Sequence, residues 1–122
     1  MSLAVMLWVA GFDIIYSILD IRIDKLEGLK SIPSVLGIPK SLWISRISHL
    51  LAFIIFIYIY MIISNLLISL FFLSAILIML LYQHIFLKPE DPKSVDRVFF
   101  LGNSVISIMF FTGILISYIF LK

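Results

Sequence analysis

Four apolar runs dominate the chain, and three of them are long enough to cross a lipid bilayer. These three cover residues 42–63, 66–86 and 98–121. An α-helix rises about 1.5 Å per residue, so about 20 residues span the roughly 30 Å hydrocarbon layer of a membrane. The fourth run, residues 2–19, is barely long enough and carries Asp13 within it. The pattern predicts an all-α, multi-spanning membrane bundle of about four helices.

The composition agrees with this prediction. Hydrophobic residues make up 63% of the chain and charged residues 13%. A soluble domain has about half apolar and about a quarter charged residues, so a water-soluble globule is not expected. The net charge of +2 is too small to indicate a nucleic-acid partner, and the absence of cysteine excludes disulfides and thiolate metal sites. Residues 1–122 are therefore expected to form a single membrane domain.

The charged residues predict how the chain is oriented in the membrane. Nearly all of them fall in residues 20–40 and 88–97. If each apolar run crosses the bilayer once, both stretches lie on one side. Together with Arg46, that side holds eight of the nine Lys and Arg residues, and only Lys122 lies opposite. The positive-inside rule makes the charged side cytoplasmic, so we expect a multi-pass protein of the cell (inner) membrane.

The sequence also predicts the form of the connections between the runs. Only Ser64 and Asn65 separate the runs 42–63 and 66–86, which predicts a tight antiparallel helical hairpin. Proline interrupts helices, so the charged stretches are expected to be loops because they contain four prolines: Pro33, Pro39, Pro89 and Pro92.

Three aspartates recur at helical spacing near the first apolar run. In a helix extended from residue 2 through Asp24, Asp20 and Asp24 each lie about 20° from Asp13 around the axis, on opposite sides of it. Tyr16 and Ser17 fall within about 60° of the same line. One stripe thus collects three carboxylates, a phenol and a hydroxyl. An unpaired carboxylate near the bilayer centre costs on the order of 2.5–3.5 kcal/mol, so the stripe needs a partner.

A divalent cation is one candidate partner. No basic residue precedes Arg22 in this helix, and Mg²⁺ binds one or two carboxylates together with water and phosphate oxygens. Lys25 and Lys30 would then meet phosphate charge that the metal leaves uncompensated. The alternative is that Asp20 and Asp24 are ordinary solvated charges balanced by Arg22 and Lys25.

Other polar residues in the runs carry weaker signals. His49 and His84 are thirty-five positions apart, without metal-ligand spacing, and His84 is expected to be a satisfied residue at the membrane interface. Tyr58, Tyr60 and Tyr118 are expected in the aromatic belt at the opposite interface.

The aspartate segment also resembles a known motif. The sequence DIIYSILDIRID has the form DxxYSxxDxxxD, and GLKSIP follows it at once. This resembles the second aspartate-rich motif of the UbiA superfamily of intramembrane aromatic prenyltransferases. The resemblance continues through YQHIFLKPEDPKSVDRVFFLGNSVISIMFF, which is similar to the last loop and helix of bacterial 4-hydroxybenzoate polyprenyltransferases of ubiquinone and menaquinone biosynthesis.

The resemblance implies a nine-helix, all-α membrane fold with a central cavity. In that family two aspartate-rich motifs hold Mg²⁺ and the diphosphate of a polyprenyl donor, and the acceptor is an aromatic acid. Asp20 and Asp24 match the pair that serves the metal, and Asp13 matches the start of the motif, so all three are expected to be catalytic. Tyr16 and Ser17 would line the same cavity, and Lys30 would contact the diphosphate.

The chain also departs from the family pattern. The first motif, NDxxDxxxD, is absent from all 122 residues. The chain resembles the C-terminal two-fifths of the family fold, beginning at about the sixth helix, and it is expected to be inactive without a partner that supplies the N-terminal half. A fragment, a split gene and a degenerate copy all remain open, as do the acceptor and the prenyl length. The runner-up hypothesis is a non-catalytic membrane protein or a cation-conducting transporter fragment that uses the aspartate stripe.

Overall fold

The computed structural model describes residues 1–120, and all the regular secondary structure in that range is helical. Residue 121, the expected last residue of the run 98–121, lies outside the described residues. Four helices are long and apolar enough to cross a membrane, as predicted. The elements are α1 (Ser2–Ser17), the 3₁₀ turn η1 (Ile18–Asp20), α2 (Ile21–Glu27), α3 (Ile32–Leu36), α4 (Ile38–Ile63), α5 (Leu66–Ile85) and α6 (Pro92–Phe120).

Two of the long helices begin earlier than expected. The apolar runs predicted starts at residues 42 and 98, whereas α4 begins at Ile38 and α6 at Pro92. The prolines explain the difference, because Pro39 and Pro92 occupy the first turns of these helices. A proline there loses no hydrogen bond, since the first backbone N–H groups of a helix have no intrahelical partner. The expected loops are therefore wrong at these two positions, and also at Pro33, which lies in α3.

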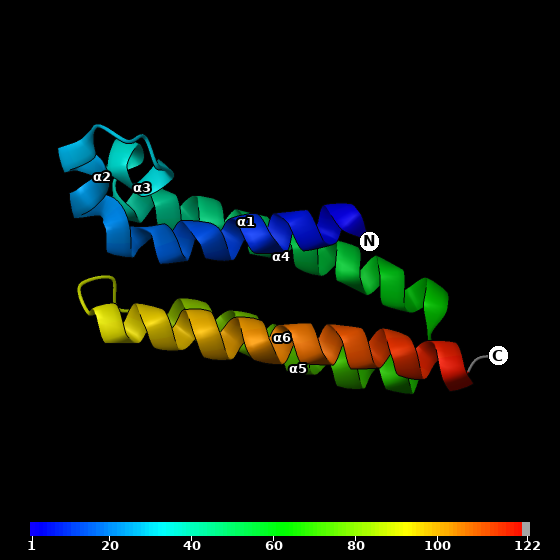
Figure 1. Ribbon diagram of the computed structural model, residues 1–122. Coiled ribbons are helices and arrows are strands. Elements are labelled where there is room, and N and C mark those ends of the chain that lie inside the picture. Colours follow the sequence, from blue (N-terminus) through cyan, green and yellow to red (C-terminus); the bar gives the residue numbers. More distant parts are fainter. Residues whose placement is uncertain (121–122) are drawn as a thin grey trace.

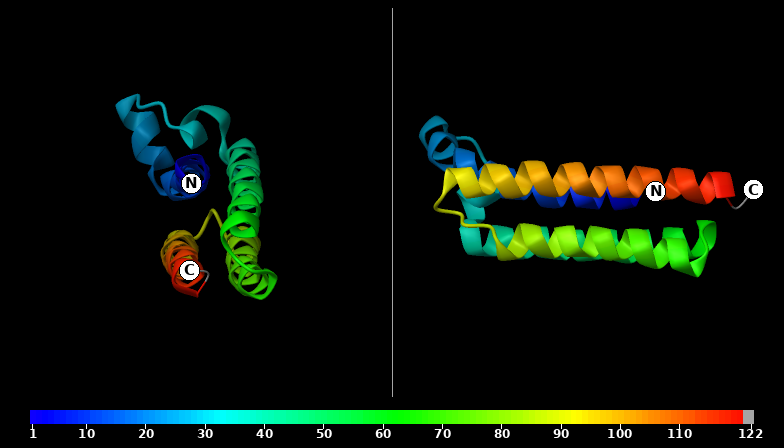
Figure 2. Two further views of the ribbon diagram at one scale, coloured as in Figure 1. Left: turned by 90° about the vertical axis from the view of Figure 1, so that its right-hand side faces the viewer. Right: turned by 90° about the horizontal axis from the view of Figure 1, so that it is seen from below.

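The four long helices pack as two pairs. Helix α1 packs most extensively against α4, and α5 against α6 (Figure 1). Viewed along the helices, α1 and α6 lie on one side of the bundle and α4 and α5 on the other (Figure 2). Both charged stretches lie at one end of the bundle, and the turn between α4 and α5 lies at the other end. This is the arrangement that the charge pattern predicts.

The predicted hairpin forms at Ser64 and Asn65. The Asn65 side chain caps α5 by accepting a hydrogen bond from the Ile68 N–H at 2.9 Å. Ser69, one turn into α5, donates to the Tyr60 carbonyl at 3.2 Å and so joins the two helices beyond the turn.

Glycines allow the helices to approach each other closely. A Cβ atom on Gly11 would collide with the His49 ring, and one on Gly113 would collide with Tyr60 and Phe72. Such small residues are common where membrane helices meet, because packing rather than hydrophobicity holds these helices together. Tyr60 itself is fully buried and donates to the Phe110 carbonyl at 3.3 Å. Its assignment to an interfacial belt is therefore wrong.

Candidate functional site

The helix that carries the aspartates is not continuous. It is α-helical through Ser17, tightens to a 3₁₀ turn over Ile18–Asp20 and resumes as α2, which turns away from the α1 axis (Figure 1). The Ser17 hydroxyl donates to the Ile14 carbonyl at 2.9 Å, and such back-bonding often bends helices. A 3₁₀ turn advances about 120° per residue instead of about 100°, so the later carboxylates are rotated by roughly 60° from the predicted stripe.

A cavity of about 400 Å³ lies between α1 and the segment that leads into α3. Three of the predicted site residues line it together: Asp13, Ser17 and Lys30. One residue with a carboxylate, one with a hydroxyl and one with an ammonium group thus lie at one open hollow, whose surface is mostly apolar, at the charged end of the bundle. Such a mixture suits a ligand that carries both negative charge and hydrogen-bonding oxygens.

The turn between α2 and α3 brings Lys30 back beside α1. Helix α2 ends at Gly28, whose φ of 69° lies in the left-handed region that glycine adopts without strain. The Leu29 N–H then bonds to the Asp24 carbonyl at 2.8 Å. Ser31 and Ser34 form a reciprocal capping box that starts α3 two residues after Lys30. Because α3 packs against α1 and α4, the chain folds back beside Asp13.

The other predicted residues lie apart from this cavity. Tyr16 packs against Phe99 of α6, with ring centroids 4.3 Å apart, and Phe99 also contacts Phe12. Asp20 is exposed and Asp24 is partly exposed, and neither lines the cavity. The structure therefore joins Asp13, Ser17 and Lys30, and it does not bring Tyr16, Asp20 and Asp24 into the same cavity.

The three aspartate side chains have no hydrogen-bond or ion-pair partner within residues 1–120. In the same part of the chain, no three His, Asp or Glu side chains lie close enough together to hold a metal ion by themselves. The donors nevertheless fit Mg²⁺ in type, because it prefers carboxylate oxygens and commonly takes only one or two of them from a protein. Free carboxylates at the charged end of the bundle meet that requirement.

The sequence prediction missed a histidine pair inside the bundle. His49 Nδ1 lies 2.9 Å from His84 Nε2, and His49 Nε2 lies 3.2 Å from the Trp8 carbonyl. One signal was available in the sequence. His49 lies 15 residues before Ser64 and His84 19 residues after Asn65, so in an antiparallel hairpin they are about one helical turn apart in depth.

Comparison with known proteins agrees with these features. The chain matches the model of the UbiA prenyltransferase family over residues 1–117. No curated protein and no solved structure gave a match. The match covers the aspartate segment, the cavity and all four long helices. The chain belongs to the UbiA prenyltransferase family.

Proposed function

We propose that this chain supplies the diphosphate-binding part of a Mg²⁺-dependent prenyltransferase. The reaction would transfer a polyprenyl group from polyprenyl diphosphate to an aromatic acid such as 4-hydroxybenzoate, as in quinone biosynthesis. The observation that carries this proposal is the cavity where Asp13, Ser17 and Lys30 meet, at the charged end of a bundle with four candidate membrane spans. We propose that this end faces the cytoplasm across the cell membrane, because it carries nearly all the basic residues.

Each predicted residue has a role in this proposal. Asp20 and Asp24 would hold Mg²⁺ through their free carboxylates. Lys30 would bind phosphate oxygens with its ammonium group, and Ser17 would hydrogen-bond to the same ligand. Asp13 lies at the same cavity and would add a third polar side chain to it. When bound, Mg²⁺ would offset the negative charge that builds up on the departing diphosphate.

The reaction itself requires a dry site. The allylic C–O bond of the donor breaks, both electrons leave with the diphosphate, and an aromatic ring carbon attacks the carbon that remains and then loses its proton. Water at this carbon would produce an alcohol instead. Phe12 and Tyr16 of α1 form an aromatic row with Phe99 of α6, and we propose that this row excludes water from the reacting carbon.

We further propose that the 122 residues do not catalyse transfer by themselves. The family uses two aspartate-rich motifs, and the pattern NDxxDxxxD does not occur in the chain. Asp13, Tyr16 and Asp20 are exposed, so this side of α1 is open to a second helical unit. That unit would supply the first motif. Expressing a family N-terminal half together with this chain should produce Mg²⁺-dependent prenylation that neither half shows alone.

The binding step can be tested directly. We expect the purified chain in lipid nanodiscs to bind a non-hydrolysable polyprenyl diphosphate analogue in the presence of Mg²⁺. Asp20→Ala and Asp24→Ala should abolish Mg²⁺-dependent binding, whereas Asp96→Ala, which removes an exposed carboxylate from α6, should not. Binding that persists without Mg²⁺, or that survives both motif substitutions, would refute the proposed function.

The alternative function is cation conduction. It is favoured by one observation, which is that Asp13 lies within a candidate membrane span without an ion-pair partner in residues 1–120. Cation flux through liposomes that contain the chain, abolished by Asp13→Asn and accompanied by no binding of the diphosphate analogue, would support conduction over prenyl transfer.

A further inference from the structure

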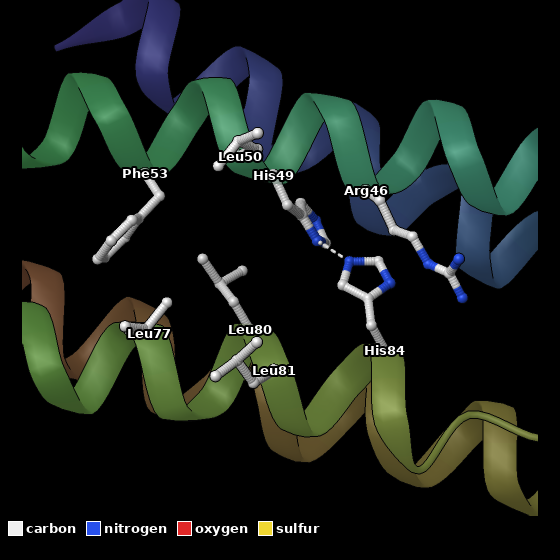
Figure 3. Close-up of a pocket in the computed structure, with 8 residues that line it drawn as sticks. All are labelled: Arg46, His49, Leu50, Phe53, Leu77, Leu80, Leu81 and His84. Atoms are coloured by element: carbon white, nitrogen blue, oxygen red, sulfur yellow. Dashed lines mark hydrogen bonds between the residues drawn. The ribbon is translucent and has the colours of Figure 1, made fainter.

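An apolar groove runs along the surface between α4 and α5. It consists of two adjoining cavities, of about 260 Å³ and about 320 Å³, which share Phe53 and Leu77 in their walls. The first cavity begins at Arg46 and His84, near the charged end of the bundle (Figure 3). The second continues to Met61, beside the hairpin. We call the two together the α4–α5 groove.

The groove has the dimensions and surface of a hydrocarbon site. Between its two ends the walls are almost entirely apolar. Leu50, Leu77 and Leu81 remain exposed along it, so the groove is open at the surface of the bundle. From Arg46 to Met61 the helix rises about 22 Å, which suits one extended acyl chain lying parallel to α4.

Two residues with polar side chains stand at the end of the groove near the charged side. Arg46 and His84 lie next to each other there (Figure 3). The Arg46 guanidinium lies 5.3 Å from the centroid of the exposed Trp43 ring and makes no ion pair within residues 1–120. Trp is enriched where membrane helices meet the headgroup layer, so this guanidinium lies at the depth of lipid phosphates.

The hydrogen bonds of the histidine pair determine which nitrogen of His84 can accept a further hydrogen bond. The Trp8 carbonyl can only accept, so His49 carries its hydrogen on Nε2. The neutral His49 ring then accepts at Nδ1, which requires that His84 donate from Nε2. The remaining nitrogen, His84 Nδ1, is buried, has no partner and keeps a bare lone pair. An acceptor without a donor therefore lies next to Arg46 at this end of the groove, enclosed by the surrounding side chains.

We propose that the α4–α5 groove binds one anionic phospholipid of the surrounding bilayer whose headgroup carries a free hydroxyl. The phosphate binds Arg46, the hydroxyl donates to His84 Nδ1, and one acyl chain lies along Phe53 and Leu77 toward the hairpin. Basic pockets between membrane helices on the cytoplasmic side are a known form of lipid-headgroup site. The occupant needs both groups, because Arg46 requires an anion and the bare imidazole nitrogen requires a donor. This site is separate from the aspartate cavity, which lies on α1.

Three lipids that differ only in the headgroup test this assignment. Phosphatidylglycerol has the anionic phosphate and hydroxyls, phosphatidylmethanol has the phosphate alone, and phosphatidylcholine is zwitterionic. The chain is reconstituted with an equimolar mixture, transferred to detergent, and its retained lipid measured by native mass spectrometry. We expect phosphatidylglycerol to be retained about fivefold better than phosphatidylmethanol, because one additional neutral hydrogen bond changes the affinity by about that factor. Phosphatidylcholine should be retained least.

Matched variants locate the site. Arg46→Gln should lower retention of phosphatidylglycerol about tenfold, because a charge-assisted contact is lost. Arg97→Gln, which removes an exposed arginine from α6, should leave it unchanged. Leu77→Trp should fill the groove and lower retention by about the same factor, since it excludes the acyl chain. Leu115→Trp is its control, because Leu115 is similarly exposed on α6.

Three results would overturn the proposal. Equal retention of phosphatidylglycerol by the Arg46→Gln and Arg97→Gln variants would mean that the lipid binds without a specific contact to Arg46. Equal retention of phosphatidylglycerol and phosphatidylmethanol would show that the headgroup hydroxyl makes no hydrogen bond to His84. Displacement of the lipid by a polyprenyl diphosphate analogue, dependent on Arg46, would make the groove a donor site instead. Because Asp20→Ala does not touch this groove, lipid retention in that variant should equal that of the unmodified chain even if the proposed function fails.

Discussion

His49 Nδ1 lies 2.9 Å from His84 Nε2, and this contact joins α4 to α5 well inside the bundle. The same imidazole donates to the Trp8 carbonyl at 3.2 Å. One side chain therefore holds three helices together, across the boundary between the α1–α4 pair and the α5–α6 pair. In an apolar surrounding, a polar contact of this kind also fixes the rotation of each helix about its own axis.

Removing the histidine should loosen the bundle. We expect His49→Phe to lower the free energy of unfolding by about 1–2 kcal/mol, because the Trp8 carbonyl loses its bond to the imidazole and the His84 N–H loses its partner. Leu50→Phe introduces the same side chain at the neighbouring exposed position and should have little effect. Unfolding in mixed detergent micelles, followed by circular dichroism, measures both variants. Equal stability of the two would show that the histidine contact contributes nothing.

The close approach of α1 and α4 depends on Gly11. A Cβ there would collide with His49 ring atoms, so Gly11→Ala should destabilise the bundle by about 1–3 kcal/mol. His49→Ala removes the obstructing ring, and the double variant should be less destabilised than the sum of the two single ones. Stability measured for all four proteins forms a double-mutant cycle. Strict additivity would contradict the inferred contact.

Lys30 should contribute to binding of the diphosphate. Replacing it by glutamine removes one charge-assisted contact, so the affinity for a polyprenyl diphosphate analogue should fall about tenfold. Lys93→Gln removes an equally exposed charge at the start of α6, away from the cavity. Titration of both variants in nanodiscs with Mg²⁺ present compares them directly. A loss of the same size in Lys93→Gln would indicate a general effect of surface charge.

The absence of cysteine makes the membrane topology easy to test. Single cysteines can replace Glu27, Glu90 and Leu67, all of them exposed. We expect a membrane-impermeant maleimide to label positions 27 and 90 from the cytoplasmic side and position 67 from the opposite side, because the structure places the two charged stretches at one end and the hairpin at the other. Labelling of positions 27 and 90 from different sides would refute the four-span arrangement.

The hairpin should depend on its cap. Asn65→Ala removes the acceptor for the Ile68 N–H and should cost about 1 kcal/mol of stability. Ser64→Ala is the matched control, because the Ser64 hydroxyl has no hydrogen-bond partner within residues 1–120. Thermal unfolding in detergent compares the two. A larger loss for Ser64→Ala than for Asn65→Ala would contradict the assigned cap.

The sequence alone determined the features that depend on local composition. Four long apolar helices, the hairpin at Ser64 and Asn65 and the common end of both charged stretches all follow from the lengths of the apolar runs and the positions of the charges. The family membership also followed, because its aspartate motif lies in one continuous segment, residues 13–24. These properties belong to single segments and do not require knowledge of which segments touch.

Only the tertiary structure decided how the side chains meet. The 3₁₀ turn before Asp20 rotated the later carboxylates, the fold-back after Gly28 brought Lys30 to Asp13, and packing turned Tyr60 inward. The histidine pair arose because α4 and α5 face each other at that depth. Hydropathy reports whether a helix enters the membrane, but in an apolar chain nearly every face is apolar. The rotation of each helix is therefore set by glycine contacts and a few polar side chains, which pair only once the helices have packed.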